Sequence, residues 1–405
     1  MGEGLMKATA RCRLGAASPG GLALPDAAPT PSQLYAPRGV FLNEEWLVVA
    51  DSGNHRILLW RGLPAQDGQP ADVVLCQRDF FAEGPSANGR GPANGLHLPT
   101  GVAIHHGRLL VADPWHHRIL VWENVPTASD TPPDYALGQP DLESTAPNQG
   151  GATRSDTLYW PYAFGFAGKW FYIADTGNRR VLGWQGFPLP GQPPHVILGQ
   201  PDGRSKDENR GGPVSPKSFR WPHAIAGNDD VLYVADAGNH RVLGWDGLPE
   251  SDRDADLVLG QKDFTSAVEW PYATQGPAAM RFPYSIALQY GTLAVADTAN
   301  NRVLFWHNLP RRGAGVPANE VIGQVDFQGN GENRWKAVLP DTLCWPYGLA
   351  LFQRTLVVAD SGNNRVTLWE IEDTRSSTEK RKCWSLTEQE KSNVSCGSRT
   401  SERNL

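Results

Sequence analysis

The feature that most constrains this chain is a segment that recurs six times at nearly constant spacing. Its first copy runs Ala-Asp-Ser-Gly-Asn-His-Arg-Ile-Leu-Leu-Trp, from Ala50 to Trp60. The aspartates of the six copies lie 61 to 63 residues apart, at Asp51, Asp113, Asp175, Asp236, Asp297 and Asp360. Self-similarity at a fixed period indicates a repeat architecture in which each copy forms one structural unit.

Each copy predicts two strands joined by a tight corner. The run before the aspartate is apolar and rich in β-branched residues, and we expect the Gly-Asn after it to supply positive-φ residues for a short hairpin. An arginine follows each aspartate by five residues, at Arg56, Arg118, Arg180, Arg241, Arg302 and Arg365. A charge-assisted hydrogen bond contributes about 1.5–3 kcal/mol, so we interpret the Asp–Arg pairs as a structural clamp. The closing tryptophan of each copy is expected to pack between units.

Two further recurring segments complete each period. A proline stands fourteen residues before each aspartate and opens a run of alternating small and apolar residues, which favours a strand crowded against an axis. A segment like Val-Leu-Gly-Gln follows the tryptophan in every period except the last, and Arg11-Cys-Arg-Leu-Gly15 resembles the missing copy. Four strands in each of six periods predict an all-β fold. It is a six-bladed β-propeller of four-stranded antiparallel blades, with the ring closed by an N-terminal strand that completes the last blade.

The repeat also predicts how the chain is divided. We expect a leader over residues 1–9, one propeller over 10–370 and a disordered polar tail over 374–405, where apolar residues are too few to form a core. Linkers of about twenty residues separate the blades. The expected blades span residues 36–80, 98–142, 160–203, 221–264, 282–327, and 345–370 together with 10–16.

The motif Ala-Asp-x-Gly-Asn-x-Arg-Val, with Pro-x-Gly-Val-Ala before it, resembles the NHL repeat, the unit of six-bladed NHL propellers. The resemblance covers roughly residues 10–370. Blade two departs from the motif with Pro114-Trp-His-His, and blade five has Ala299 in place of glycine, so we expect these two corners to differ locally. The resemblance implies several possible activities, because the family includes zinc-dependent lyases as well as propellers that bind RNA or protein.

Composition narrows the choice of function. The chain has 37 basic and 43 acidic residues and a net charge of −6, which favours neither nucleic acid nor an anionic membrane as a partner. No apolar run approaches the ~18 residues of a membrane span, and the N-terminus lacks the apolar core of a secretory signal. The five cysteines show no metal-ligand spacing and are interpreted as reduced thiols. We therefore expect a cytoplasmic monomer.

Candidate ligand residues lie where the regular repeat varies. The innermost strands are expected to start at one mouth of the central channel, on the face that carries the corners and linkers. The residues directly after the repeat prolines differ from blade to blade: Arg38, Thr100, Tyr162, His223, Tyr284 and Tyr347. Four large aromatic residues precede the prolines: Trp160, Trp221, Phe282 and Trp345. These residues predict either a ligand site with aromatic walls or a plug that closes the channel.

The sequence assigns no catalytic residue, no cofactor and no metal. Pro222-His-Ala-Ile resembles a zinc-ligand position of the family's lyases, but the other five mouth positions lack histidine, and His223 alone cannot build a three-histidine site. Six other histidines fall in turns or linkers and are expected to be mostly exposed: His97, His105, His106, His116, His117 and His240.

These observations predict a non-catalytic binding or scaffolding propeller. Its partner would be a protein or small ligand, engaged through the linker face and the channel mouth. A lyase or hydrolase that uses the mouth is the alternative. RNA binding through the mildly basic linker 202–220 is a third hypothesis, which needs a basic patch with stacking aromatics.

Overall fold

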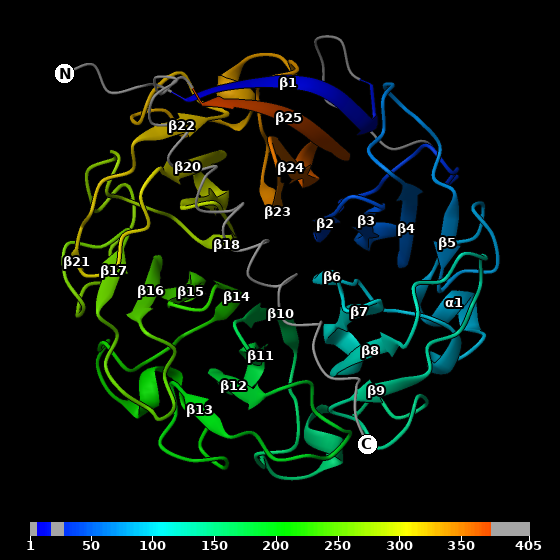
Figure 1. Cartoon of the computed structure of the whole chain (residues 1–405), viewed down its shortest axis with the longest axis horizontal. Helices are drawn as coiled ribbons and strands as arrows, with labels where there is room; N and C mark the ends of the chain where they lie inside the picture. The colour runs from blue at the N-terminus through cyan, green and yellow to red at the C-terminus, as the bar shows by residue number, and fades with distance from the viewer. Residues whose placement is uncertain (1–5, 18–27, 374–405) are drawn as a thin grey trace, which may run out of the picture.

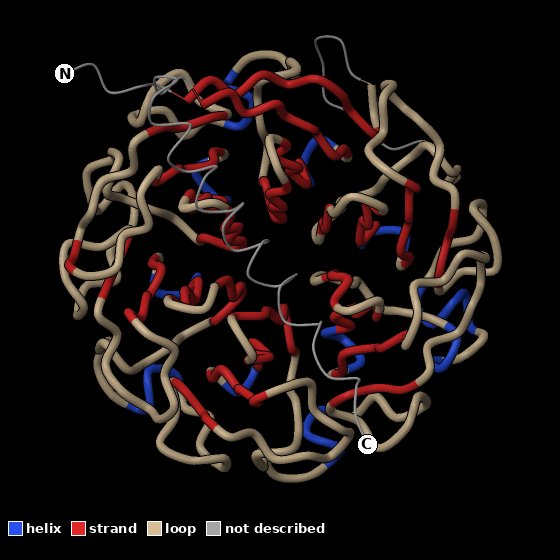
Figure 2. The backbone as a smooth tube through the Cα atoms, in the orientation of Figure 1, coloured by secondary structure: helices blue, strands red, loops and turns tan. Residues whose placement is uncertain are grey.

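The computed structural model describes residues 6–17 and 28–373, which form a ring of six sheets around one axis (Figure 1). Within each blade the strands follow one another from the axis to the rim, and loops surround the ring (Figure 2). This arrangement is the predicted all-β six-bladed propeller. The predicted tail over 374–405 lies outside the described residues.

Blades one to three each contain four consecutive antiparallel strands. Blade one comprises β2 (Val40–Leu42), β3 (Trp46–Asp51), β4 (Arg56–Arg61) and β5 (Val73–Leu75). Blade two comprises β6 (Val102–His105), β7 (Arg108–Asp113), β8 (Arg118–Trp122) and β9 (Tyr135–Leu137). Blade three comprises β10 (Pro161–Ala167), β11 (Trp170–Asp175), β12 (Arg180–Gln185) and β13 (Val196–Leu198).

The other three blades follow the same plan with two variations. Blade four comprises β14 (Pro222–Gly227), β15 (Val231–Asp236), β16 (Arg241–Asp246) and β17 (Leu257–Leu259). Blade five comprises β18 (Pro283–Gln289), β19 (Thr292–Asp297), β20 (Arg302–Trp306) and β22 (Glu320–Ile322), and its loop adds the short β21 (Gly313–Ala314) in parallel to β17. Blade six comprises β23 (Pro346–Phe352), β24 (Thr355–Asp360), β25 (Arg365–Asp373) and β1 (Met6–Gly15).

The N-terminal strand closes the ring. β1 runs antiparallel to β25, with Leu14 opposite Val366 and Met6 opposite Asp373, so it starts five residues before the predicted Arg11 and includes residues 6–9 of the predicted leader. It also contacts blade one, where the backbone N–H of Gly68 donates to the carbonyl of Arg13 at 2.8 Å. The strand therefore joins the first and last blades noncovalently.

Each Asp-x-Gly-Asn corner is a single 3-10 turn, and its positive φ falls one residue later than predicted. The residue after the asparagine is left-handed, as in His55 with φ 54°. Glycine is needed at the corner for space instead, because a Cβ on Gly53 would lie 2.6 Å from the ring of Tyr35. The six corner turns are η1 (Ser52–Asn54), η3 (Pro114–His116), η5 (Thr176–Asn178), η7 (Ala237–Asn239), η8 (Thr298–Asn300) and η10 (Ser361–Asn363).

The corners of blades two and five keep the common backbone, so the prediction that they differ is wrong for the main chain. Their left-handed residues, His117 and Asn301, have φ of 57° and 55°. Trp115 replaces glycine in blade two without a clash, because the facing linker residue is His97, whose ring stacks on the indole with centroids 5.5 Å apart. Short helical turns also occur in the linkers: α1 (Pro85–Gly89), η2 (Pro92–Asn94), η4 (Pro147–Gly150), η6 (Glu208–Gly211) and η9 (Glu332–Trp335).

The hydrophobic core is divided among the six blade interfaces. The buried apolar residues form six clusters, each of which joins two neighbouring blades and contains one closing tryptophan. Trp60 lies in the cluster that joins blades six and one, together with Leu14 of β1. The closing tryptophans are thus the interface residues that the sequence predicts, and they are Trp60, Trp122, Trp184, Trp245, Trp306 and Trp369.

Candidate functional site

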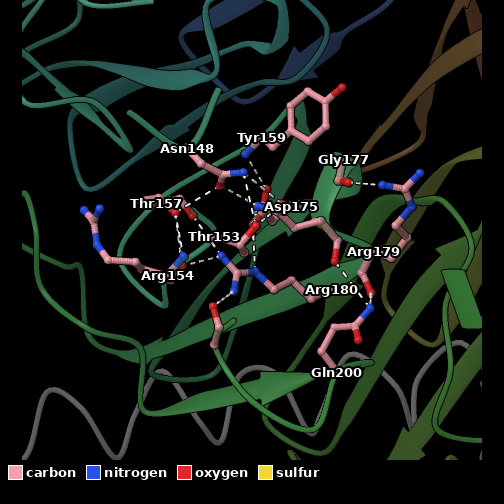
Figure 3. A network of polar contacts seen from close by, with 12 residues as sticks. Asn148, Thr153, Arg154, Thr157, Tyr159, Asp175, Gly177, Arg179, Arg180 and Gln200 are labelled. Atoms are coloured by element: carbon pink, nitrogen blue, oxygen red, sulfur yellow. Dashed lines mark hydrogen bonds and ion pairs between the residues drawn. The ribbon is translucent and has the colours of Figure 1, made fainter. Parts of the chain in front are cut away.

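The Asp–Arg pairs hold the linkers as well as the corners. In blade three the Arg180 Nε donates to Asp175 Oδ2 at 2.8 Å, and both side chains are fully buried (Figure 3). The other carboxylate oxygen accepts the backbone N–H of Tyr159 at 2.8 Å. The remaining guanidinium nitrogens donate to three linker carbonyls, those of Arg154, Thr157 and Gly203. The pair therefore connects one corner to the linkers on both sides of the blade.

The same ion pair occurs in all six blades, with N–O distances of 2.7 to 2.9 Å. Every aspartate is fully buried, and every arginine is at most 4% exposed. The hydrogen-bonding groups of such a buried pair are used by partners within the protein, so the pair is not available to bind a ligand or a reactant.

A second inter-blade contact was not predicted. The left-handed residue after each corner accepts a hydrogen bond from the backbone N–H of the residue before the next repeat proline. His117 Nδ1 accepts from Trp160 at 3.1 Å, and Asn301 Oδ1 accepts from Trp345 at 2.8 Å. Arg179 is the exception because it has no acceptor, and the N–H of Trp221 turns to Asp236 instead. The sequence signal was present, since five of the six positions are His or Asn: His55, His117, His240, Asn301 and Asn364.

This contact corrects the prediction that the turn and linker histidines are mostly exposed. His116, His117 and His240 are buried, His97 and His105 are half-buried, and His106 is exposed. Burial lowers the pKa of His117 to about 4 and also lowers the pKa of His240. Because these rings accept hydrogen bonds through Nδ1 in the interior, they stay neutral at physiological pH.

The six variable mouth residues converge on the axis, where all of them line one central cavity of about 240 Å³. The His223 and Tyr284 rings stack with centroids 4.5 Å apart, Tyr162 lies 4.2 Å from His223, and Tyr347 lies 5.0 Å from Tyr284. The Arg38 guanidinium covers the ring of Tyr347 at 5.1 Å. These rings contact one another and also form the wall of the cavity, so the geometry contains elements of both the predicted site and the predicted plug.

Blade packing brings these residues close to the axis. A Cβ on Gly348 would lie 2.0 Å from the carbonyl oxygen of Arg38, so only glycine permits this approach of blades six and one. Thr100 is buried, and its hydroxyl donates to the carbonyl of Tyr162 in the next blade. The Thr100 hydroxyl therefore connects two blades, and its proton is not available to a ligand in the cavity.

Arg38 is the only charged side chain among the described residues that line the cavity. It forms no ion pair with any carboxylate in the described part of the chain. Burial lowers the pKa of His223 to about 4, helped by the Arg38 charge, and burial raises the pKa of Tyr284 to about 12. At neutral pH the mouth thus carries one positive charge on an otherwise neutral aromatic wall.

The Tyr162 hydroxyl is a buried polar group at the mouth. It makes no hydrogen bond of good geometry within the described residues, and the Arg38 guanidinium is the polar side chain near it. Burial raises its pKa, whereas the Arg38 charge opposes that rise. A buried hydroxyl without a partner is costly, so this group is a site where a ligand atom would be stabilised.

The four aromatic residues before the prolines do not line the cavity, but they extend the aromatic surface outward. Trp160 lies 5.5 Å from Tyr162 and 6.3 Å from the half-exposed Trp115, and Phe282 lies 6.4 Å from Tyr284. Trp221 packs on Phe282 at 6.2 Å. The indole nitrogen of Trp345 donates to Glu332 at 2.9 Å.

Other candidate features are accounted for by local contacts. In the mildly basic linker, three of the five basic residues, Arg210, Lys217 and Arg220, form ion pairs with Asp252, Asp254 and Glu208. His223 Nδ1 lies 2.9 Å from the carbonyl of Trp221. In residues 6–17 and 28–373 no group of three His, Cys, Asp or Glu side chains is arranged to hold a metal ion. Cys12, Cys76 and Cys344 are free and buried.

None of the helices in the described part of the chain is long and apolar enough to cross a membrane.

Comparison with known proteins gives no family assignment, because no family model and no curated protein matches the chain. Among solved structures, the chain is similar to the WD40 β-propeller domain of Doa1, with 12% identity, a TM-score of 0.44 and coverage of 91% of this chain and 94% of the other. It is also similar to the PQQ-bound aldose sugar dehydrogenase from Streptomyces coelicolor, with 13% identity, a TM-score of 0.42 and coverage of 88% of this chain and 100% of the other. A third similar structure is a structural genomics protein of unknown function from Bacteroides thetaiotaomicron, with 10% identity, a TM-score of 0.43 and coverage of 91% of this chain and 77% of the other. The assignment of six blades comes from the chain's own sheets.

Proposed function

We propose that this protein is an NHL-type propeller that binds a small molecule in its channel mouth, and that the ligand carries an anionic group on a planar body. The single observation behind this proposal is the unpaired Arg38 guanidinium in a cavity whose described lining has no other charge. A charge without a partner in a partly desolvated site favours a ligand of opposite charge. The cavity volume of about 240 Å³ suits a small ligand.

The wall of the cavity supports a planar ligand body. Tyr284 and His223 stack nearly parallel, at an interplanar angle of 14°, and the Tyr162 hydroxyl provides one donor without a partner in the described residues. A carboxylate or phosphate on an aromatic ring would pair with Arg38 and Tyr162 while its ring lies against Tyr284 or Tyr347. Arginine is well suited to this role because its planar fork of donors matches a carboxylate.

Thermal shift with matched probes tests the proposal. Benzoate and benzamide share ring and size, and only benzoate is charged. We expect benzoate to raise the melting temperature of the wild-type protein and benzamide to have little effect. Arg38→Gln should abolish the difference, whereas Arg61→Gln, a change at an exposed arginine that lies over Trp46 and outside the cavity lining, should keep it. An equal response to both probes, or an unchanged benzoate shift in Arg38→Gln, would contradict the proposal.

Protein binding on the linker face is the second candidate function. Of fourteen exposed large hydrophobic residues in the described ranges, all but Leu63, Leu189 and Tyr290 lie in corners or linkers, which leaves eleven in these segments. Tyr272 and Trp335 are the most exposed aromatic residues there, at 84% and 77%. A partner on this face would be lost in a Tyr272→Ser/Trp335→Ser variant and retained in a Leu63→Ser/Leu189→Ser variant, as measured by co-purification.

A further inference from the structure

We propose a second site, separate from the channel mouth, in which Ser86 is a nucleophile activated by His116 and Asp113. The Ser86 Oγ lies 3.3 Å from His116 Nε2, and His116 Nδ1 lies 2.8 Å from Asp113 Oδ2. Nucleophile, base and orienting carboxylate thus follow one another at hydrogen-bond distances, which is the arrangement that activates serine for acyl transfer. The proposal goes beyond ligand binding in the channel and does not depend on it.

The other blades show what this position normally contains. Linker asparagines pair with corner asparagines through their amides, at 2.9 Å for Asn178–Asn148 and 2.8 Å for Asn239–Asn209. A third such pair, Asn363–Asn333, measures 2.9 Å. In each pair the partners are 30 residues apart, as are Ser86 and His116. The fold therefore accepts two asparagines here, and blade two has replaced both.

The replacement is not explained by the backbone. Ser86 has φ 51° and ψ 42°, and the linker asparagines that correspond to it, such as Asn148 and Asn333, are also left-handed. Asparagine tolerates this region much better than serine, so serine is the less favourable residue for the local conformation. The pair keeps a hydrogen bond between linker and corner, but it also adds a hydroxyl and an imidazole, which two amides cannot provide.

The polarity of the hydrogen bonds matches the proposed role. In the amide pairs, the corner asparagine donates its Nδ2 to the aspartate, as Asn178 does to Asp175 at 2.8 Å. His116 takes this place in blade two, where its Nδ1 lies 2.8 Å from Asp113 Oδ2 and 3.3 Å from Arg118 Nη2. Because the carboxylate is the closer partner, we assign the proton of the neutral ring to Nδ1. Its Nε2 is then the unprotonated acceptor that faces the Ser86 hydroxyl. Burial disfavours the charged form of Asp113, but the hydrogen bond to His116 and the charge of Arg118, at 2.9 Å, outweigh it and lower the pKa of this carboxyl group.

The surroundings indicate the class of substrate. His116 and Asp113 are buried, whereas Ser86 is partly exposed, so the base is shielded and the nucleophile remains accessible. The His97 ring lies 5.8 Å from His116 and stacks on Trp115, whose side chain is 47% exposed. An aromatic surface beside the proposed base favours an ester whose acyl or alkoxy group is apolar.

The reaction is an ester hydrolysis in two balanced steps. The Ser86 Oγ attacks the carbonyl carbon, His116 Nε2 takes the hydroxyl proton, and that proton passes to the departing alkoxide to release the alcohol. Water then attacks the acyl carbon of the acyl-serine. His116 Nε2 takes a proton from this water and gives it to Ser86 Oγ as the bond between Oγ and the acyl carbon breaks and the carboxylic acid leaves. A fluorophosphonate reacts by the first half alone, forming a P–O bond and releasing fluoride and the proton.

Labelling of the intact protein with a fluorophosphonate probe, followed by peptide mass mapping, tests the site. The matched control is Ser86→Asn/His116→Asn, which restores the amide pair of blades three, four and six and is expected to keep the wild-type melting temperature. We expect label on Ser86 in the wild type and none on residue 86 in this control. His116→Asn alone should slow labelling about 10²–10⁴-fold, the usual contribution of a general base.

Two results would overturn the proposal. One is a folded wild-type protein in which Ser86 remains unlabelled under conditions that label a known serine esterase. The other is labelling of Ser86 at the same rate in His116→Asn, which would show that the histidine has only the structural role of the asparagine it replaces. Hydrolysis of p-nitrophenyl butyrate by the wild type, lost in Ser86→Ala, would extend the result from labelling to turnover.

Discussion

Removal of residues 1–16 should destabilise the protein severely, because β1 forms the outer strand of blade six. Nine residue pairs join β1 to β25, and backbone hydrogen bonds contribute a net ~0.5–1.5 kcal/mol each. Leu14, only 1% exposed, is lost from the cluster that joins blades six and one, at a further ~1.5–3 kcal/mol. The sum is comparable with the whole stability of a typical protein, ~5–15 kcal/mol.

The assay is urea unfolding followed by tryptophan fluorescence, with three comparisons. Leu14→Ala should lower stability by about 2–5 kcal/mol, the usual cost of such a core truncation. Arg11→Ala, on the same strand, removes an exposed ion pair with Glu370 and should cost at most about 1 kcal/mol. Deletion of 375–405, which the composition predicts to lack a core, should cost almost nothing. If the deletion of 1–16 unfolds together with the full-length protein, β1 does not close the ring.

Three further predictions concern the clamps and the mouth. Asp175→Asn should cost about 3–5 kcal/mol in a thermal melt, because it leaves the Arg180 charge buried and unpaired. His117 has a folded pKa lowered to about 4 from 6.5, so its protonation favours unfolding and stability falls as pH drops from 6.5 toward 4. His117→Asn keeps the acceptor, as Asn301 does in blade five, and should remove on the order of 2 kcal/mol of that acid sensitivity in melts at pH 7 and pH 4.5. Tyr284→Ala/Tyr347→Ala should abolish benzoate binding with little change in melting temperature, whereas a large loss of stability with intact binding would favour the plug.

The propeller could be predicted because the spacing of a short sequence motif determines how the whole chain is divided into blades. The period gives the number of blades, and the missing fourth strand of the last period identifies Leu14 and its neighbours as the closing strand. Along that strand Leu14 is buried and Arg11 is exposed. These features need no knowledge of side-chain partners.

Contacts between segments that are distant in the sequence and meet only in the folded ring could not be predicted in the same way. The histidine at position 117 bonds a backbone N–H 43 residues away, and only the ring brings these atoms together. Ser86 and His116 likewise come from a linker and a corner 30 residues apart. At the mouth, the sequence showed which positions vary. Only the structure shows that no carboxylate is among the described residues that line the cavity with Arg38.

The most direct test of the proposed function is a crystal structure of the protein soaked with 4-iodobenzoate, recorded with anomalous scattering from iodine. We predict an iodine peak inside the central cavity, with the carboxylate within hydrogen-bond distance of the Arg38 guanidinium and the Tyr162 hydroxyl. The same soak of Arg38→Gln should show no peak there. An iodine peak only outside the cavity in the wild-type crystal, or an equal peak in the variant, would contradict the account.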